Sequence, residues 1–503
     1  MSVHVELRRG AYHDSVSLLQ VSRAVAGAPG VEAAQVAMAT ELNVDVLRGM
    51  GFTVPEEAGP NDLVVALRAT DDDGLATGLA AVEDALAALS ATAGSTGADD
   101  EVPPGTLGSA VRRSGARLAL VSVPGAHAVT ETYDAIAAGA SVMLFSDNVS
   151  VADEVALKDA AAAADVLVMG PDCGTALVGG VALGFADVVR AGPVGIVAAS
   201  GTGAQQAMCL LDAAGVGLSH CLGVGGRDLS AAVGGRSTRQ ALRALAADAA
   251  TDWVLVVSKP PDPEVLAAME REVETLGLRA HWAILGPGRP DLTAAVEQAL
   301  TAEGVTVPDW PAVIAATDAP GRPADAPVTP GSLRGLFCGG TLAEEAALVA
   351  GAVLGPVSSN LGHDPEHALG RDLRAPGHVV VDFGADELTR GRAHPMIDPT
   401  LRMERIAAEA ADPTCGVLLL DLVLGHGAHP DPGPELAEAV RAARDTARGA
   451  GRELPVVVSL CGTDADPQDR RRTEAALAAA GASVFLSNAA AARHAAGILG
   501  GAR

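Results

Sequence analysis

A β-branched run that ends in Ser200-Gly201-Thr202-Gly203 is the segment of this chain best suited to binding a small anion. The run reads as a short strand, and a helical pattern begins directly after it. The unpaired N–H groups at a helix start, together with the positive end of the helix dipole, favour a phosphate or a carboxylate. We therefore predict that Ser200, Gly201, Thr202 and Gly203 bind an anion, although an ordinary strand-to-helix turn needs glycine as well.

The residues around this turn exclude three better-known sites. Ala198 stands where a nucleophile elbow requires glycine, and Gln206 stands where a dinucleotide fingerprint has its third glycine. The G-x-x-x-x-G-K-[ST] motif of a P-loop occurs nowhere in the sequence. The turn is therefore a simpler anion site or a structural turn.

Two further glycine turns follow predicted strands nearby, in residues 170–174 and 223–227. Glycines let the backbone approach a ligand closely, and an arginine can pair with an oxyanion. We predict a secondary ligand-binding turn and, from the second segment, a catalytic arginine that is otherwise a surface charge. The turn residues are Asp172, Cys173, Gly225 and Gly226, and the arginine is Arg227.

In a fourth segment, residues 418–432, a predicted buried strand is followed by a loop rich in glycine, histidine and aspartate. Doubly wound folds bind ligands in loops at the carboxyl ends of their strands. We predict that Gly425 and Gly427 bind the anion through their backbone and that His426 and His429 act as acid–base groups. The alternative is a rigid polar loop. A His-x-x-His pair without a third ligand is a poor metal site, so no metal is expected.

The composition excludes several classes of protein. The formal net charge of −27 argues against nucleic acid as a partner, because phosphate contacts need a basic face. Six cysteines without a C-x-x-C spacing disfavour a zinc site or a disulfide framework and suit a reducing compartment. The first residues read as a strand and not as a signal peptide, and no apolar run reaches membrane-spanning length. We therefore expect a cytoplasmic protein without membrane contact.

The arrangement of predicted elements indicates an α/β protein of several domains. Residues 1–98 mix strands and helices in the order of a small ferredoxin-like α+β domain. From residue 116 onwards, near-continuous apolar strands alternate with amphipathic helices, which predicts doubly wound parallel sheets. Segments rich in proline, glycine or polar residues, at 91–108 and 316–331, are predicted linkers. The remaining boundaries give three α/β domains, at residues 110–191, 192–315 and 332–503.

Several phrases resemble the succinyl-CoA synthetase family. Gly170-Pro171-Asp172-Cys173, Val194-Gly195-Ile196-Val197 with Ser200-Gly201-Thr202, and Gly223-Val224-Gly225-Gly226 are similar in order and spacing to phrases of its α subunit. Residues 455–464 are similar to the carboxyl domain of its β subunit. The resemblance implies a Rossmann-like CoA-binding domain at 110–191, a CoA-ligase-like domain at 192–315 and a flavodoxin-like CoA-ligase domain at 332–503.

The order of these parts resembles the FdrA family, in which α-like and β-like halves follow a small N-terminal domain. Residues 10–18, 339–343 and 419–432 are similar to phrases of that family. The resemblance implies a subunit of an oxamate carbamoyltransferase, which converts oxalurate and phosphate into oxamate and carbamoyl phosphate. It also implies that Ser200–Gly203 and Gly425–Gly427 begin two opposed helices that grip the phosphate, and that other subunits complete the enzyme.

The chain departs from the synthetase in two respects. Where that family carries its phosphorylated histidine, residues 284–289 contain no histidine. The nucleotide-binding module of the β subunit is missing as well, so no cofactor is expected. The alternatives are an acyl-CoA ligase that binds CoA and, from another class, a non-catalytic scaffold or regulator. A homo-oligomer is compatible with any of them.

Overall fold

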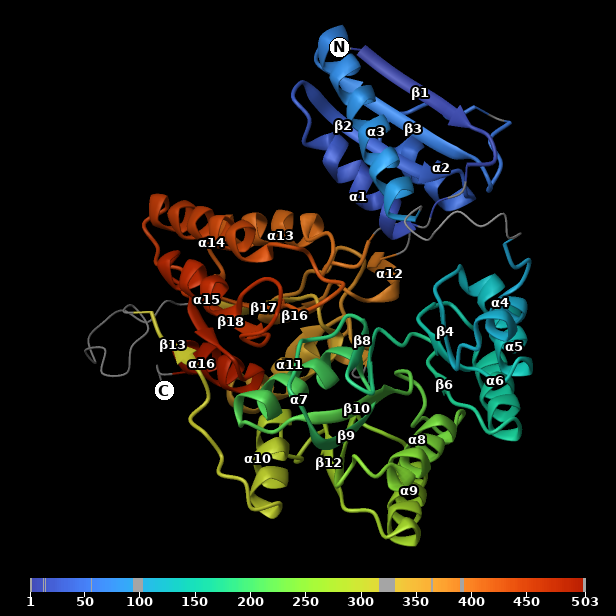
Figure 1. Ribbon diagram of the computed structural model, residues 1–503. Helices are drawn as coiled ribbons and strands as arrows, with labels where there is room; N and C mark the ends of the chain where they lie inside the picture. Colours follow the sequence, from blue (N-terminus) through green and yellow to red (C-terminus); the bar gives the residue numbers. More distant parts are fainter. Residues whose placement is uncertain are drawn as a thin grey trace. The chain divides into compact units, whose positions relative to one another are not determined.

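The structure is a computed structural model (Figure 1) that describes residues 2–11, 13, 15–55, 57–93, 103–315, 331–362, 365–389 and 393–500. Most of the predicted linker at 316–331 and part of that at 91–108 lie outside these residues, as do Tyr12 and Asp14 of the FdrA-like phrase. The chain divides into two compact units. The first comprises residues 1–103 and 389–393, and the second comprises 104–388 and 394–503.

The first unit is a small α+β domain, as the sequence predicted. Its elements are β1 (Ser2–Arg8), α1 (Ser15–Ala26), β2 (Val31–Met38), α2 (Glu41–Gly49), β3 (Leu63–Ala69) and α3 (Asp72–Ala93). Strand β3 lies between β1 and β2 and is antiparallel to both, which is the split arrangement of a ferredoxin-like fold. Helices α1 and α3 cover one face of the sheet, and α2 with Phe52 covers the other. Both faces are thus buried.

The second unit begins with a parallel three-stranded sheet. Its strands are β4 (Leu118–Val121), β5 (Ser141–Leu144) and β6 (Val168–Met169), and its helices are α4 (Leu107–Ser114), α5 (Gly125–Ala137) and α6 (Val151–Ala163). The buried ammonium group of Lys158 on α6 donates to Glu154 and to Asp228, each at 2.7 Å. This ion network ties the small sheet to the loop that follows strand β10 (Leu218–Gly223) of the next sheet.

A six-stranded sheet comes next, in the order β12-β11-β9-β10-β7-β8. Strands β9 (Ala191–Ala199), β10 (Leu218–Gly223), β11 (Trp253–Ser258) and β12 (Ala280–Ile284) are parallel. The helices are α7 (Gly201–Ala213), α8 (Arg236–Ala247), α9 (Pro263–Leu276) and α10 (Leu292–Ala302). Helices α7 and α10 cover one face, and α8 and α9 cover the other. The predicted doubly wound class is confirmed.

The sequence analysis missed a hairpin at the edge of this sheet. Strands β7 (Thr175–Val178) and β8 (Val181–Gly184) are antiparallel, and β7 pairs antiparallel with β10. Gly179 and Gly180 form the turn with φ of 56° and 81°, the positive values that a tight hairpin turn requires. The hairpin precedes the predicted boundary at residue 191, yet its hydrogen bonds place it in the second sheet.

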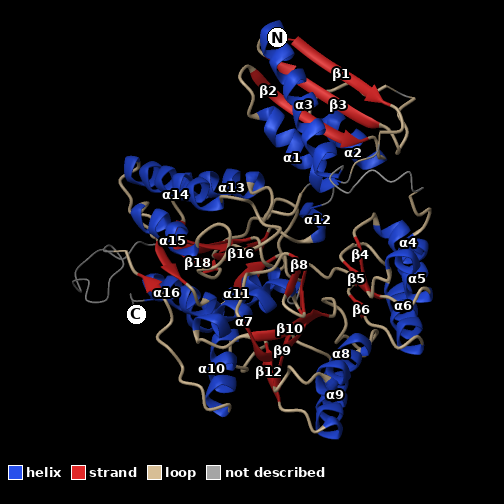
Figure 2. Cartoon of the chain, in the orientation of Figure 1, coloured by secondary structure: helices blue, strands red, loops and turns tan. Residues whose placement is uncertain are grey.

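The last sheet has seven strands, in the order β13-β19-β18-β17-β14-β16-β15. Two of them, β16 and β18, are labelled in Figure 2. All pairings are parallel except that of β13 with β19. The order from β19 to β16 is that of a flavodoxin-like sheet. The strands are β13 (Ala312–Val313), β14 (Ser332–Phe337), β15 (Val357–Ser359), β16 (His378–Asp382), β17 (Cys415–Val423), β18 (Val456–Cys461) and β19 (Ser483–Phe485).

Helices cover both faces of this sheet. Helices α11 (Gly340–Leu354) and α16 (Asn488–Gly500) lie on the face toward α7 and α10, and α13 (Thr400–Ala411), α14 (Pro432–Gly449) and α15 (Arg470–Ala479) lie on the other. The short α12 (Asp386–Thr389) follows β16. Among the described residues, no helix is both long and apolar enough to cross a membrane.

The six- and seven-stranded sheets share one hydrophobic core. It takes side chains from α7, α10, α11 and α16, which lie between the two sheets, and from strands of each. Helix α7 is buried continuously from Gly203 to Leu211. Polar contacts cross the same boundary: Gln206 on α7 donates to the Leu486 carbonyl, and Thr293 on α10 bonds to Ser487 at 2.6 Å. The α-like and β-like halves therefore form a single packed body.

Candidate functional site

The strand orders mark the ligand-binding position in each large sheet. The chain changes direction across the sheet between β9 and β11 in one case and between β14 and β17 in the other. In open α/β sheets a ligand binds outside the carboxyl ends of the strands at such a point. The loops there carry Ser200–Gly203 and Lys259 from the first sheet, and Cys338–Thr341 from the second.

Two helix starts meet at this position. The Ser200 hydroxyl lies 2.6 Å from that of Thr341 and also accepts the Gly203 N–H at 2.9 Å, so Ser200 caps α7. A Cβ placed on Gly339, the N-cap of α11, would lie 2.9 Å from the Thr202 side chain. Each helix leaves its first N–H groups without an intrahelical partner. The structure therefore brings the predicted turn at Ser200–Gly203 against the start of α11.

A buried ion pair holds the loop that opens α11. Asp421 on β17 accepts the N–H groups of Cys338 and Gly339 at 2.8 and 2.9 Å. Arg402 on α13 donates to the same carboxylate at 2.7 Å, and both side chains are almost completely buried. Asp421 thus fixes the backbone immediately before the first helical residue, Gly340.

The expectation that Gly425–Gly427 begin the opposing helix is wrong. Helix α14 starts only at Pro432, and the Gly425 N–H donates to Gln468 at 3.0 Å. Both glycines have positive φ, and a Cβ on Gly425 would lie 2.6 Å from the Ala186 carbonyl. The loop pairs its backbone with the α-like half between Ala186 and His426. These glycines permit close contact between the halves.

Lys259 and Asp382 flank the start of α11. A Cβ on Gly340 would lie 2.7 Å from an Asp382 carboxylate oxygen and 3.6 Å from the Lys259 ammonium nitrogen. Burial raises the pKa of Asp382 to about 7, even though the Gly384 N–H and Lys259 favour its ionised form. Lys259 also lies 3.9 Å from a carboxylate oxygen of Glu344. A cation and a readily protonated acid therefore stand beside two helix starts.

Asp172, predicted as part of a ligand turn, belongs to the same charged group. The surrounding protein desolvates its carboxyl group and raises its pKa to about 7, although Asp172 as a whole is an exposed residue. The charge of Asp386 raises this pKa further, and that of Lys259 lowers it. Asp386 and Lys259 act on Asp382 in the same way. We call Asp172, Lys259, Asp382 and Asp386 the Lys259 cluster.

The other predicted turn residues surround Asp172. Gly225 has φ of 90°, and a Cβ there would lie 2.6 Å from the Pro171 carbonyl, whereas Gly226 has open space around it. The Cys173 thiol is buried against the Thr175 carbonyl, and burial raises its pKa to about 12. A protonated, buried thiol of this kind supports the turn and is chemically inert.

The side chain of Arg227 binds residues of helix α6 and of the loop before it, next to the small sheet. Its guanidinium group pairs with the buried Glu154 at 3.0 Å and donates to the Val149 carbonyl at 2.9 Å. Its charge lowers the pKa of Asp172, so it lies within electrostatic range of the Lys259 cluster. About half of its side chain is exposed. Arg227 therefore borders the cluster while it also holds two sheets together.

The two predicted histidines lie in the loop after β17. His426 is exposed and contributes its backbone to the pairing with Ala186. The Nδ1 atom of His429 accepts the Asp431 N–H at 3.0 Å, and its Nε2 atom lies 3.8 Å from Glu435. His429 also lines a small cavity with Met396 and Arg402. His429 thus helps to order the approach to α14.

The sequence analysis missed Lys259 and Asp382 as site residues. Both strands were expected, but the side chains at their carboxyl ends were not among the predicted site residues. Lys259 comes directly after β11, and Asp382 is the last residue of β16. The rule that ligands bind at carboxyl ends of parallel strands would have selected both.

Two family models match the chain. Residues 1–103 match the model described as "AllF, heavy metal-associated domain", and residues 336–498 match the model described as "CoA-ligase". A curated relative, "Uncharacterized protein YahF" of Escherichia coli (strain K12), is 38% identical over 484 residues, which cover 93% of this chain and 92% of the relative.

Two solved structures resemble the chain weakly. Acetyl-coenzyme A synthetase 1 from Ca. Korarchaeum cryptofilum is 14% identical, covers 76% of this chain and 82% of its own, and has a TM-score of 0.28. ATP citrate lyase from Methanothrix soehngenii is 14% identical, covers 40% of this chain and 37% of its own, and has a TM-score of 0.30. Superpositions this weak carry no argument about function.

Proposed function

Because this chain belongs to the same family as YahF and carries an AllF-type N-terminal domain before a CoA-ligase domain, we propose that it is a subunit of an oxamate carbamoyltransferase. The observation that carries the proposal is the meeting of two helix starts at Ser200 and Thr341, beside Lys259. Backbone N–H groups, two positive dipole ends and an ammonium group together favour a phosphate. We further propose a cytoplasmic location, which the six free cysteines support.

The proposed reaction moves a carbamoyl group from a nitrogen to phosphate. A phosphate oxygen attacks the carbamoyl carbon of oxalurate, and a C–O bond forms while the C–N bond to oxamate breaks. The leaving nitrogen must gain a proton, and the attacking phosphate loses one, so the products are oxamate and carbamoyl phosphate. No oxidant, nucleotide or covalent carrier is needed, which agrees with the lack of histidine in residues 284–289.

We assign phosphate binding and proton transfer to different residues of the site. The helix starts at Gly201–Thr202 and Gly340–Thr341, with Lys259, hold the phosphate and stabilise the oxyanion of the transition state. Asp382, with a pKa of about 7, is protonated often enough at neutral pH to donate to the leaving nitrogen, and it recovers a proton from the phosphate. We assign this transfer to Asp382 in place of the predicted His426 and His429, because Asp382 stands at the helix start.

An acyl-CoA ligase is the second candidate, because the CoA-ligase model matches residues 336–498. Such an enzyme binds CoA tightly, whereas a carbamoyltransferase has no use for it. Isothermal titration of the full chain with CoA separates the two candidates. Saturable CoA binding that competes with phosphate would favour the ligase.

The carbamoyltransferase proposal is tested in extracts of the source cells, with the gene intact, deleted, or replaced by a variant. We expect phosphate-dependent cleavage of oxalurate to disappear on deletion and to fall by at least about tenfold in Lys259→Met, since one charged contact to the phosphate is lost. The matched control is Arg243→Met, which removes a cation on α8 whose side chain is mostly exposed and paired with Glu272.

Two results would contradict the proposal. Oxalurate cleavage that persists without the gene would exclude the chain from the reaction. Full activity in Lys259→Met and in Gly201→Val would instead indicate a scaffold or regulatory subunit whose helix starts bind no substrate.

A further inference from the structure

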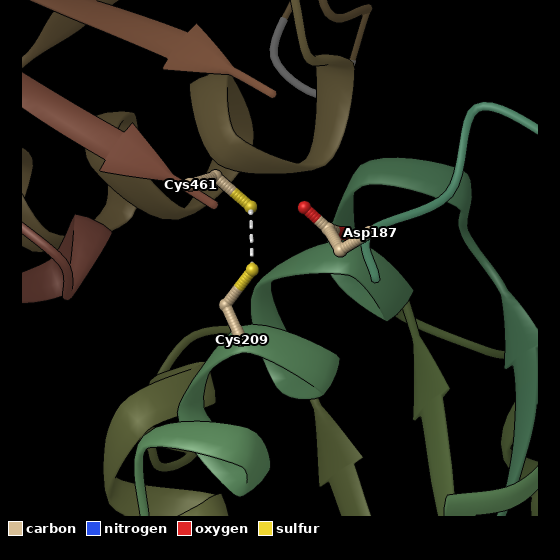
Figure 3. Close-up of side chains that lie close together, drawn as sticks. All are labelled: Asp187, Cys209 and Cys461. Carbon is tan, nitrogen blue, oxygen red and sulfur yellow. Dashed lines mark hydrogen bonds between the residues drawn. The ribbon is translucent and has the colours of Figure 1, made fainter. Parts of the chain in front are cut away.

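Three buried side chains from separate elements converge inside the shared core (Figure 3). Asp187 lies in the segment between β8 and β9, Cys209 lies on α7, and Cys461 ends β18. One ligand atom of each lies within 4.8 Å of the other two, and none of the side chains is more than 1% exposed. The group therefore joins the α-like and β-like halves at a point away from solvent.

Burial and the charge of Asp466 raise the pKa of the Asp187 carboxyl group, whereas the Cys209 thiol and the Gln205 amide lower it. Among the described residues, no donor meets hydrogen-bond geometry with either of its oxygens. The oxygen drawn in Figure 3 points toward the pair of sulfur atoms. A buried carboxylate without donors is costly unless it is protonated or coordinates a cation.

Gln205 can supply a fourth ligand atom. It lies on α7 four residues before Cys209, so the two side chains share a face of the helix. Its amide lowers the pKa of Asp187, which only its Nε2–H donors can do, and among the described residues its Oε1 atom has no donor. Rotation of the amide by 180° would present Oε1 to the group, and the set would then be two sulfur and two oxygen ligands.

The spacing of the sulfur atoms is compatible with a shared metal ion and too long for a disulfide. They lie 3.7 Å apart and share an S–H···S hydrogen bond, the dashed line in Figure 3. A tetrahedral zinc with bonds of about 2.3 Å to sulfur separates two thiolates by about 3.8 Å, whereas a disulfide requires about 2.05 Å. A disulfide would also leave the Asp187 carboxylate and the Gln205 carbonyl without partners.

We propose that Asp187, Cys209, Cys461 and Gln205 form a structural site for a zinc-class divalent cation. Binding displaces the protons of both thiols and of the carboxyl group, and the four ligands close the coordination shell. The ion links α7, which carries the Ser200 helix start, to β18 of the other half. This proposal departs from the expectation that no metal binds. The sequence did not indicate the site because its ligands lie far apart in the chain, between residues 187 and 461.

The test uses the full chain produced in medium supplemented with Zn²⁺ or with Co²⁺. Elemental analysis should find about one metal per chain after dialysis against a chelator, because the site is closed to solvent. The Co²⁺ form should show thiolate-to-cobalt absorption in the near ultraviolet. Cys461→Ser should lose the absorption and most of the metal, whereas Cys415→Ser, which alters an equally buried cysteine outside the group, should keep both.

If Cys461→Ser does not fold, anomalous scattering from crystals of the unaltered Co²⁺-grown chain decides the question. A peak between the sulfur atoms of Cys209 and Cys461 would support the site. Metal content equal to that of Cys461→Ser, a map without such a peak, or a Cys209–Cys461 disulfide found by mass spectrometry would each overturn it.

Discussion

Asp382 has a pKa of about 7 because it is buried at a position where its charge is only partly compensated. The Gly384 N–H and Lys259 favour the carboxylate, but burial and the charges of Asp386 and Asp421 oppose it. A carboxyl group whose pKa lies near 7 gains and loses its proton readily at neutral pH. This is the property that a general acid for carbamoyl transfer requires.

Asp382→Asn should therefore alter the pH dependence of oxalurate cleavage. In the natural chain the rate should fall as the pH rises above about 7, because the donor form is lost. The variant should be slower by about 10²–10⁴-fold and should lack that falling limb. Initial rates across the pH range measure this. A slow variant that keeps the limb would assign the proton transfer to another group, such as Asp172.

The raised pKa of Asp382 also makes the stability of the fold depend on pH. Its pKa is raised in the folded state, so the fold binds more protons than the unfolded chain between pH 3.8 and about 7. The contribution of Asp382 is therefore fully present below that window and is lost as the pH rises through it. Asp382→Asn should gain stability relative to the natural chain as the pH increases from about 4 to about 8.

Denaturant unfolding at the two ends of that window measures the difference. Asp445→Asn is the control, because Asp445 belongs to an exposed pair with Arg448 and should shift stability little at either pH. A difference between Asp382→Asn and the natural chain that does not change with pH would show that the carboxyl is ionised throughout.

Sequence patterns located the backbone of the site better than its side chains. Ser200–Gly203 was identified because a glycine turn between a strand and a helix is a local signal. Asp172 was identified for the same reason. Lys259 and Asp382 were not, because their importance depends on strands that become neighbours only in the folded sheets. Assigning a partner to Ser200–Gly203 required the same knowledge, and the sequence analysis chose the Gly425 loop in place of α11.

At the scale of elements, the start of α11 depends on a buried charge pair. Asp421 binds two backbone N–H groups and Arg402, so removing its carboxylate leaves a buried guanidinium group without a counterion. Breaking one partner of a buried pair costs about 3–5 kcal/mol. Asp421→Ala should therefore lower the free energy of unfolding by about that amount.

Chemical denaturation measures this change, and the exposed pair of Asp445 and Arg448 again supplies the control. Asp445→Ala should cost no more than about 1 kcal/mol. A loss for Asp421→Ala as small as that of the control would show that the loop before α11 holds its shape without the carboxylate.

The type and order of most elements followed from the sequence. Long apolar strands between amphipathic helices have a strong pattern, and the strands near residues 194, 253, 333, 417 and 455 were all expected. The β7–β8 hairpin was missed because its strands are short, although the Gly179-Gly180 pair is a recognised hairpin signal. Strand β13 has too few residues to show any periodicity.

At the scale of the whole molecule, the two large sheets were expected as separate domains, but they share one hydrophobic core. Domain boundaries predicted from linker composition show where the chain passes from one domain to the next. They do not show which hydrophobic surfaces pack together. The first unit, in contrast, has cores of its own on both faces of its sheet. Separate cores predict separate unfolding, and a shared core predicts joint unfolding.

Scanning calorimetry should therefore resolve two transitions, one for the first unit and one for the two large sheets together. Three buried substitutions assign them: Val65→Ala in β3, Leu255→Ala in β11 and Leu419→Ala in β17. Each leucine change should cost about 2–5 kcal/mol. Both should lower the same transition, because the two side chains belong to one core, while Val65→Ala should lower only the other. If Leu255→Ala and Leu419→Ala moved different transitions, the halves would be independent domains, and the contact between Ser200 and Thr341 could not keep two helix starts together on one phosphate.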